Sequence, residues 1–239
     1  MDKGSPPASP IHAHRVAMYD MDRTITRSGT YSGFLIHVAR RRQQWRLLLL
    51  PLVGIAGLAY MLRLIDRSRL KAINLRLLVG GRFQRTEIMP LAESYADHVV
   101  ERGLHPAALE QIAADRAAGY RLLLATASFH LYVDAIARRL GIDDVLATRL
   151  DEPDGADHIH ARLAGDNCYG AAKFARIADW LEGNAITRDE AHIRAYSDHV
   201  SDHPMLHFAD EAIATTPSRK LRLLAPKMGW QVVDWRARR

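Results

Sequence analysis

Short apolar runs alternate with amphipathic stretches over most of the chain. The runs have the length of buried strands, and the stretches repeat their apolar positions at helical spacing. Strands are predicted at 15–19, 120–126, 145–150, 158–163, 192–197, 212–216 and 231–235. Helices are predicted at 107–118, 131–140, 171–181 and 204–208. Because strands that alternate with helices pair in parallel, the fold class is predicted to be α/β with a parallel sheet.

The region between the first two predicted strands has a different pattern. Helices are predicted over 29–40 and 66–103, with a break at Gly80-Gly81 and a new helix starting at Pro90, where proline suits a first turn. We therefore expect a helical insert at 28–105. The core is then formed by 11–27 together with 106–239.

The insert contains an apolar run, 47–62, that holds sixteen residues without a charge. A membrane-spanning helix needs about 20 apolar residues, and about 17 at the short end. The run therefore leaves three possibilities open. It is a buried or amphipathic helix of a helical domain, a segment inserted into one membrane leaflet, or a true span.

Composition limits the environment of the protein. The chain has 239 residues, 48% hydrophobic and 25% charged, which suits one large domain or a domain with an insert. Its single cysteine, Cys168, excludes an intrachain disulfide and fits a reducing compartment, so a cytoplasmic location is expected. Residues 1–10 are rich in Pro and Ser and predict a disordered leader rather than a secretory signal.

Positive charge is concentrated near the apolar run. The formal net charge is +6, and the stretch 23–65 contains seven arginines and no acidic residue. Such a surface attracts nucleic acid, anionic lipid or a phosphorylated substrate. No zinc-finger spacing, RNP-like motif or helix-turn-helix pattern is present, so nucleic acid is not an expected partner. An anionic membrane surface is an expected partner, contacted through residues 40–71. This contact would place the protein at the inner face of the membrane.

Two carboxylates stand where the first predicted strand ends. Asp20 and Asp22 are spaced i, i+2, so on an extended strand they share a face. Paired buried carboxylates are costly unless a cation or a reaction requires them. One can attack phosphorus and form an aspartyl-phosphate, and the other can serve as general acid and base.

Three further segments supply polar groups at strand or helix ends. A strand ends at Thr126 and Ser128, where a hydroxyl and free N–H groups suit phosphate oxygens. Lys173 lies early in a predicted helix, and Asp198 and Asp202 follow another strand, as hard ligands for Mg²⁺ do. Nearby histidines lack the spacing of a zinc site and are assigned to the surface; they are His192, His199, His203 and His207.

The order of these segments, Asp-x-Asp-x-Thr, Thr, Lys and Asp-x₃-Asp, resembles motifs I to IV of the haloacid dehalogenase-like (HAD) phosphohydrolases, in the phosphoserine-phosphatase-like branch. The resemblance implies a Rossmann-like parallel sheet with a helical cap inserted after the first strand. It also implies that Asp20 is the nucleophile, that Asp22 is the general acid and base, and that Thr126 and Lys173 hold the phosphoryl group. Mg²⁺ would be bound by Asp20, the main-chain carbonyl of Asp22, and Asp198, with Asp202 in support.

The insert resembles that of bacterial HAD-type phosphatidylglycerophosphate phosphatases (the C class). This resemblance implies a lipid phosphate as substrate, with the apolar run docked in the bilayer. We further expect Arg23, Ser128 and Asn167 to contact the substrate. Two alternatives stay open: a soluble phosphatase of a small metabolite such as phosphoserine, and a non-enzymatic membrane-surface binder built on a HAD core.

Overall fold

A computed structural model describes residues 13–236, so the predicted leader at 1–10 lies outside the described residues. Six strands form one sheet in the order β4-β3-β1-β7-β8-β9, and every neighbouring pair is parallel. The strands are β1 (His14–Tyr19), β3 (Arg121–Phe129), β4 (Asp144–Thr148), β7 (Ala191–Ser197), β8 (Glu211–Thr215) and β9 (Gln231–Val233). The predicted α/β class with a parallel sheet is confirmed.

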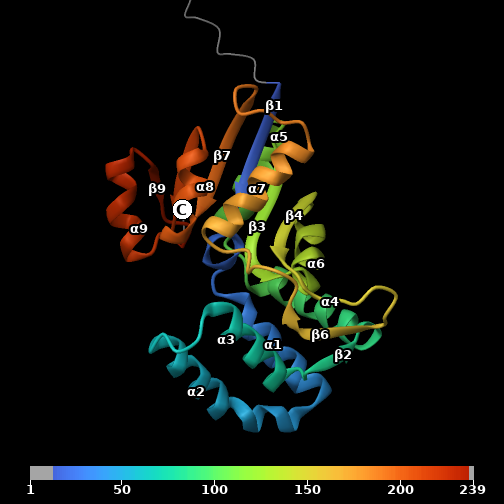
Figure 1. The fold of residues 1–239 in the computed structure, drawn as a ribbon. Helices are drawn as coiled ribbons and strands as arrows, with labels where there is room; N and C mark the ends of the chain where they lie inside the picture. Colours follow the sequence, from blue (N-terminus) through green and yellow to red (C-terminus); the bar gives the residue numbers. More distant parts are fainter. Residues whose placement is uncertain (1–12, 237–239) are drawn as a thin grey trace, which may run out of the picture.

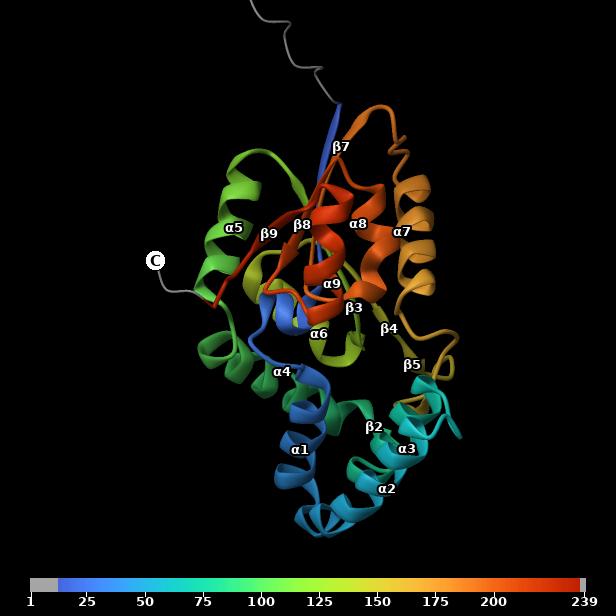
Figure 2. The same ribbon diagram turned by 90° about the vertical axis from the view of Figure 1, so that its left-hand side faces the viewer.

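Helices cover both faces of this sheet (Figures 1 and 2). Strand β1 shows why, because its alternating side chains enter two separate cores: Ala17 and Tyr19 on one face, and Val16 and Met18 on the other. The first face is packed by α5 (Pro106–Ala117) and α6 (His130–Leu140). The second is packed by α7 (Ala171–Gly183), α8 (His203–Phe208) and α9 (Arg219–Leu224).

A buried carboxylate fastens α5 to the sheet. Asp115 is completely buried. It accepts hydrogen bonds from the hydroxyls of Tyr19, at 2.5 Å, and Tyr196, at 2.9 Å, and from Arg194 at 2.7 Å. A buried charge is tolerated only when it is paired and hydrogen-bonded, and here β1 and β7 supply the partners.

A mainly helical region lies beyond the carboxyl ends of the strands (Figure 1). It contains α1 (Thr30–Arg42), a 3₁₀ helix (Gln44–Leu49), α2 (Leu50–Met61), α3 (Arg67–Leu78) and α4 (Arg85–Arg102). A small antiparallel sheet joins this region to the chain that follows β4. In it β6 (His158–Leu163) pairs with β2 (Arg82–Gln84) and with β5 (Leu150–Asp151).

Three details of the sequence prediction are wrong. Helix α4 begins at Arg85, so Pro90 lies inside it rather than at its start. The pairing of β2 with β6 orients the chain for a helix directly after Gln84, and proline at the sixth helical position removes only one backbone hydrogen bond. Strand β2 itself was expected to be helical. The strand predicted at 145–150 divides at Arg149 into β4 and β5, which belong to different sheets.

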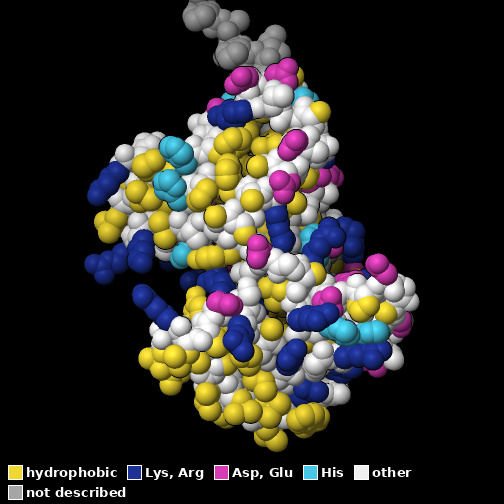
Figure 3. All heavy atoms as spheres, viewed as in Figure 1, with side chains coloured by type: hydrophobic (Ala, Val, Ile, Leu, Met, Phe, Trp, Pro, Cys, Tyr) yellow, Lys and Arg dark blue, Asp and Glu magenta, His cyan; other side chains and the backbone are white. Residues whose placement is uncertain are grey.

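The apolar run is exposed. Within 47–62 only Ala56 is buried, while Leu48 is 80% exposed, Ile55 62% and Met61 74%. The possibility of a helix buried in the protein is therefore wrong. By length and composition alone, Gln44–Met61 is apolar enough to cross a membrane. Figure 3 shows these side chains as a continuous apolar surface at the end of the molecule farthest from β1, with Lys and Arg side chains beside it.

Candidate active site

The four polar segments meet at the carboxyl edge of the parallel sheet. Asp20 directly follows β1, Thr126 lies in β3, and Asp198 directly follows β7. Lys173 lies in the first turn of α7, which starts after Gly170, a residue with a left-handed φ of 57°. Adjacent parallel strands end on one edge of a sheet, so segments far apart in sequence converge there.

The centre of the site is a buried ion-pair cluster. Lys173 Nζ donates to Asp20 Oδ1 at 2.7 Å and to Asp202 Oδ2 at 2.9 Å. The three residues are between 2% and 7% exposed. Burial works against a charged amine, but Asp20 and Asp202 together raise the pKa of Lys173 above its ordinary value. The lysine is therefore a fixed cation beside Asp20.

The carboxylates outnumber the cation. Burial raises the pKa of Asp20 to about 8; Lys173 opposes this shift, while Asp202 and Asp198 add to it. Burial also raises the pKa of Asp198 to about 7, with Asp202 contributing. Three buried carboxylates that face one lysine lack a compensating positive charge.

Thr24, to which the sequence assigned no role, connects two of these acids. Its hydroxyl donates to Asp20 Oδ2 at 3.2 Å and accepts from the backbone N–H of Asp198 at 3.0 Å. The third motif-I residue is thus buried between the ends of β1 and β7 and fixes the orientation of Asp20. The Thr of the Asp-x-Asp-x-Thr pattern was the sequence feature that could have predicted this role.

Asp22 is held by three donors at the start of α1. Its Oδ1 accepts from the backbone N–H of Thr30 at 2.7 Å and from the Thr30 hydroxyl at 2.8 Å, and its Oδ2 accepts from Ser128 at 2.8 Å. Residue Arg23 has a left-handed φ of 64°, which turns the chain directly after Asp22. An acid at a helix N-terminus is favoured by the free N–H groups there.

The remaining predicted residues lie around this centre. Thr126 is buried, and its hydroxyl accepts from the backbone N–H of Ser128 at 3.1 Å. Arg23 is exposed, and its charge lowers the pKa of Asp198 against the larger effects of burial and Asp202. Asn167 does not face the acids directly, because its Oδ1 accepts from Thr148 at 2.9 Å and from Lys71 at 2.7 Å.

Lys71 is a further residue at this site to which the sequence assigned no catalytic role. It comes from α3 and is 8% exposed. Its Nζ donates to the carbonyl of Ala127 at 2.5 Å as well as to Asn167. Burial lowers the pKa of Lys71 to about 8, and Arg67 adds to this effect while Asp22 opposes it. The available signal was helical spacing, since Lys71 shares the buried face of α3 with Asn74, Leu75 and Leu78.

The donor set suits a hard cation. Asp202 Oδ1 is buried and has no hydrogen-bond partner in the described structure. Over residues 13–236 no group of three His, Cys, Asp or Glu side chains could hold a metal by itself. Mg²⁺ does not require such a group, because it usually takes one or two carboxylates and retains several waters. The excess of buried carboxylates and the unpaired oxygen therefore fit a small divalent cation.

Comparisons with known proteins agree with this arrangement. The family model for haloacid dehalogenase-like hydrolases matches residues 17–207. The phosphoserine phosphatase SerB1 of Mycobacterium tuberculosis is 31% identical over 155 residues, which cover 64% of this chain and 48% of that protein. The chain thus matches about half the length of that relative.

Solved structures agree on the fold. A protein of unknown function from Bordetella pertussis has a TM-score of 0.84 at 25% identity, covering 93% of this chain and 99% of its own. A phosphoserine phosphatase solved as a phospho-aspartyl intermediate analogue has a TM-score of 0.59 at 16% identity, covering 93% of each chain. Because the family model covers most of the chain, the protein belongs to the haloacid dehalogenase-like hydrolases.

Proposed function

We propose that this protein is a Mg²⁺-dependent phosphomonoester hydrolase that works through an aspartyl-phosphate on Asp20. The observation that carries the proposal is the contact of Lys173 with both Asp20 and Asp202, beside Asp198. A fixed cation next to a carboxylate can offset the charge of an approaching phosphoryl group. Carboxylate nucleophiles of this kind form covalent phosphoryl intermediates.

In the first step, a carboxylate oxygen of Asp20 attacks phosphorus and the bond to the ester oxygen breaks, while Asp22 gives its proton to the leaving alcohol. In the second step, water attacks phosphorus and loses a proton to Asp22, and the Asp20–phosphorus bond breaks to release phosphate. Thr126 and Lys173 hold the phosphoryl oxygens. Arg23, Ser128 and Asn167 contact the rest of the substrate.

The hydrogen-bond partners of Asp22 suit its proposed role in proton transfer. Three donors orient its carboxylate, which accepts a proton from water in the second step. The hydroxyls of Thr30 and Ser128 can rotate and accept instead, which permits the protonated form needed for the leaving group.

Mg²⁺ would be held by Asp20, the carbonyl of Asp22 and Asp198, with Asp202 behind them; when bound, it supplies positive charge to the phosphoryl oxygens and the nucleophile. The unpaired Oδ1 of Asp202 and the raised pKa of Asp198 support this assignment. Residues 28–105 act as a cap that excludes water from the site. Lys71 is a buried cation of this cap whose charge interacts with that of Asp22.

The proposed substrate is a lipid phosphate, such as phosphatidylglycerophosphate, at the inner face of a membrane. Support comes from the exposed apolar side chains between Trp45 and Leu64, including Leu48, Ile55 and Met61 (Figure 3). Exposed apolar patches of this kind mark interaction surfaces. Adjacent arginines suit anionic headgroups, as in interfacial helices. A cationic Lys71 near Asp22 disfavours an ammonium-bearing substrate such as phosphoserine.

A substrate panel tests the proposal. It contains phosphatidylglycerophosphate, phosphatidic acid, phosphoserine and a sugar phosphate, each assayed with Mg²⁺ or with EDTA, and with or without detergent. We expect Mg²⁺-dependent phosphate release that is fastest with a lipid. Fastest release from a soluble ester would support a small-metabolite phosphatase instead. Folded protein that hydrolyses none of the four would indicate a non-enzymatic surface binder.

A further inference from the structure

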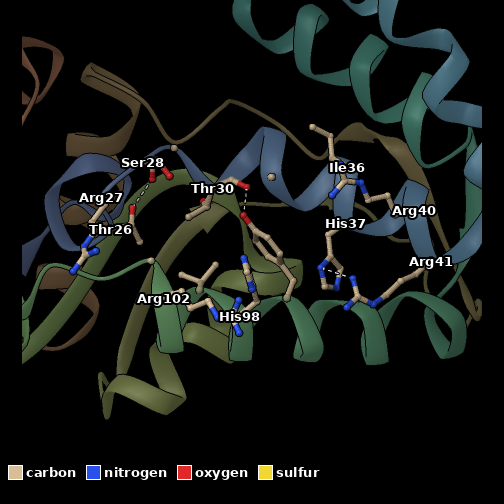
Figure 4. Close-up of a pocket in the computed structure, with 15 residues that line it drawn as sticks. Thr26, Arg27, Ser28, Thr30, Ile36, His37, Arg40, Arg41, His98 and Arg102 are labelled. Carbon is tan, nitrogen blue, oxygen red and sulfur yellow. Dashed lines mark hydrogen bonds between the residues drawn. The ribbon is translucent and has the colours of Figure 1, made fainter.

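A basic groove lies outside the carboxylate site, between α1 and α4. It has a volume of about 600 Å³. Figure 4 shows side chains from the loop before α1, from α1 and from the last turns of α4 around this space. The walls approach closely at Gly33, where a Cβ atom would lie 2.5 Å from the Tyr95 hydroxyl. The groove is therefore part of the packing between the two helices rather than a loose surface depression.

The lining of the groove is cationic. The positive charge comes from four arginines, and none of the described lining residues is acidic. The arginines are Arg27, Arg40, Arg41 and Arg102. His37 also lines the groove, but burial and the nearby Arg41 lower its pKa to about 4, so its ring is neutral at pH 7. A concave surface of one charge sign concentrates ligands of the opposite sign. An anion is therefore the class of ligand that this surface selects.

One wall of the groove is fixed by a hydrogen-bond chain. Arg41 donates to His37 Nδ1 at 2.9 Å, so Nε2 carries the ring proton and donates to Ser94 Oγ at 2.8 Å. Ser94 in turn donates to the carbonyl of Leu91 at 3.3 Å. This chain holds the Arg41 side chain in place on α1. A preorganised guanidinium loses little entropy when it binds an anion.

Two other arginines have their donors free. Arg40 and Arg102 form no hydrogen bond and no ion pair with any residue between 13 and 236. Arg27, by contrast, uses Nε on the carbonyl of Leu104 at 2.9 Å. Guanidinium groups bind phosphate oxygens through two parallel N–H donors. The uncommitted donors thus come from both helices that border the groove.

We propose that this groove binds a phosphorylated anion at a site distinct from the carboxylate cluster. The two sites share Thr30, which lines the groove and also donates to Asp22. The ligand chemistry, a phosphate ester with two or more negative charges, is common to free phosphate compounds and to phospholipid headgroups. The following experiment separates the two sources.

The groove variant is Arg40→Gln/Arg102→Gln in the full chain. The matched control is Arg219→Gln/Arg222→Gln, which removes the same charge from exposed positions on α9. In the soluble arm, inorganic pyrophosphate is titrated by calorimetry without Mg²⁺. In the lipid arm, co-sedimentation is measured with phosphatidylcholine vesicles that contain or lack phosphatidic acid. Circular dichroism checks that every variant is folded.

We expect the groove variant to bind one of the two probes about tenfold more weakly than the wild type, while the control changes less than twofold. Loss confined to pyrophosphate identifies a free phosphate compound, and loss confined to phosphatidic acid vesicles identifies a lipid headgroup. The proposal is overturned if the groove variant and the control bind both probes equally. Because the readout is binding, the result does not depend on whether the protein hydrolyses a lipid.

Discussion

At the level of single residues, the least expected feature of the site is the buried amine of Lys71. Lys71 places this amine, from α3, against Asn167 and against Ala127, which follows Thr126 in β3. A buried lysine is retained only where its charge or its donors are used. In the proposed enzyme, we expect the charge of Lys71 to favour a negatively charged substrate over an ammonium-bearing one.

The stability of the protein is predicted to rise with pH through the titration of Lys71. Its folded pKa is lowered to about 8, whereas the unfolded value is near 10.5. Between these values the unfolded chain holds a proton that the folded chain has released, so the free energy of unfolding increases with pH, by up to about 3 kcal/mol. Urea denaturation of the wild type and Lys71→Met at pH 7.5 and pH 10 measures the difference between them.

Lys227→Met, at an exposed position on the 3₁₀ turn Ala225–Met228, is the control and is expected to follow the wild type. A gap between the wild type and Lys71→Met that is the same at both pH values would mean that Lys71 titrates normally in the folded protein. The burial of Lys71 would then not determine its charge.

At the level of elements, α5 depends on one carboxylate. Asp115 accepts from Tyr19, Tyr196 and Arg194. Asp115→Ala leaves two buried hydroxyls and a guanidinium without their acceptor, and we expect a loss of about 3–5 kcal/mol in the free energy of unfolding, measured in urea. The control Asp179→Ala changes an exposed acid on α7 and should cost less than about 0.5 kcal/mol. A loss below about 1 kcal/mol for Asp115→Ala would refute this role.

Helix α2 is expected to act on membranes without supporting the fold. Ile55 is 62% exposed and Leu58 52%, so Ile55→Ser/Leu58→Ser should leave the urea midpoint unchanged. The fraction of protein that floats with anionic liposomes should fall at least about tenfold. Full burial of each of these side chains in lipid contributes roughly 1.5–3 kcal/mol, so partial burial of the two is enough for this loss.

The matched control for α2 is Leu109→Ser/Leu223→Ser, which removes two exposed leucines from α5 and α9. It should float like the wild type. If both double variants float equally, α2 is not the docking element, and its exposed side chains have another partner.

Across the whole molecule, local signals identified the sheet and its edge. Apolar runs that stop at Asp20, Thr126 and Asp198 predicted parallel strands. The structure brings Lys173 into contact with Asp20 and Asp202 at the edge of that sheet. A few neighbouring residues are enough to identify the end of each strand, so the sheet and its catalytic edge could be predicted from the sequence.

The features that the sequence did not predict depend on contacts between segments far apart in the chain. Strand β2 has three residues and exists through its pairing with β6, some 75 residues later. Lys71 looks like one basic residue among several until α3 packs against β3 and Asn167. The apolar run 47–62 has the same composition whether it is buried in protein or placed in lipid, so its exposure could be learned only from the fold.

The overall arrangement explains how the proposed chemistry reaches its substrate. The carboxylate cluster lies at one edge of the sheet, the helical region lies beyond that edge, and the apolar surface of α2 forms the far end of the molecule (Figures 1 and 3). A protein docked through α2 would present its cap, including Lys71, between the bilayer and the cluster around Asp20. In the proposed mechanism, Asp20 must become phosphorylated during turnover.

Acid quenching of the reaction with radiolabelled phosphatidylglycerophosphate tests that requirement most directly. With Mg²⁺, the wild type is predicted to carry covalent label on the peptide that contains Asp20. Asp20→Asn is predicted to carry none and to lose at least about a thousandfold in rate, while Asp179→Asn behaves as the wild type. Turnover without label on this peptide, or wild-type turnover by Asp20→Asn, would contradict the account.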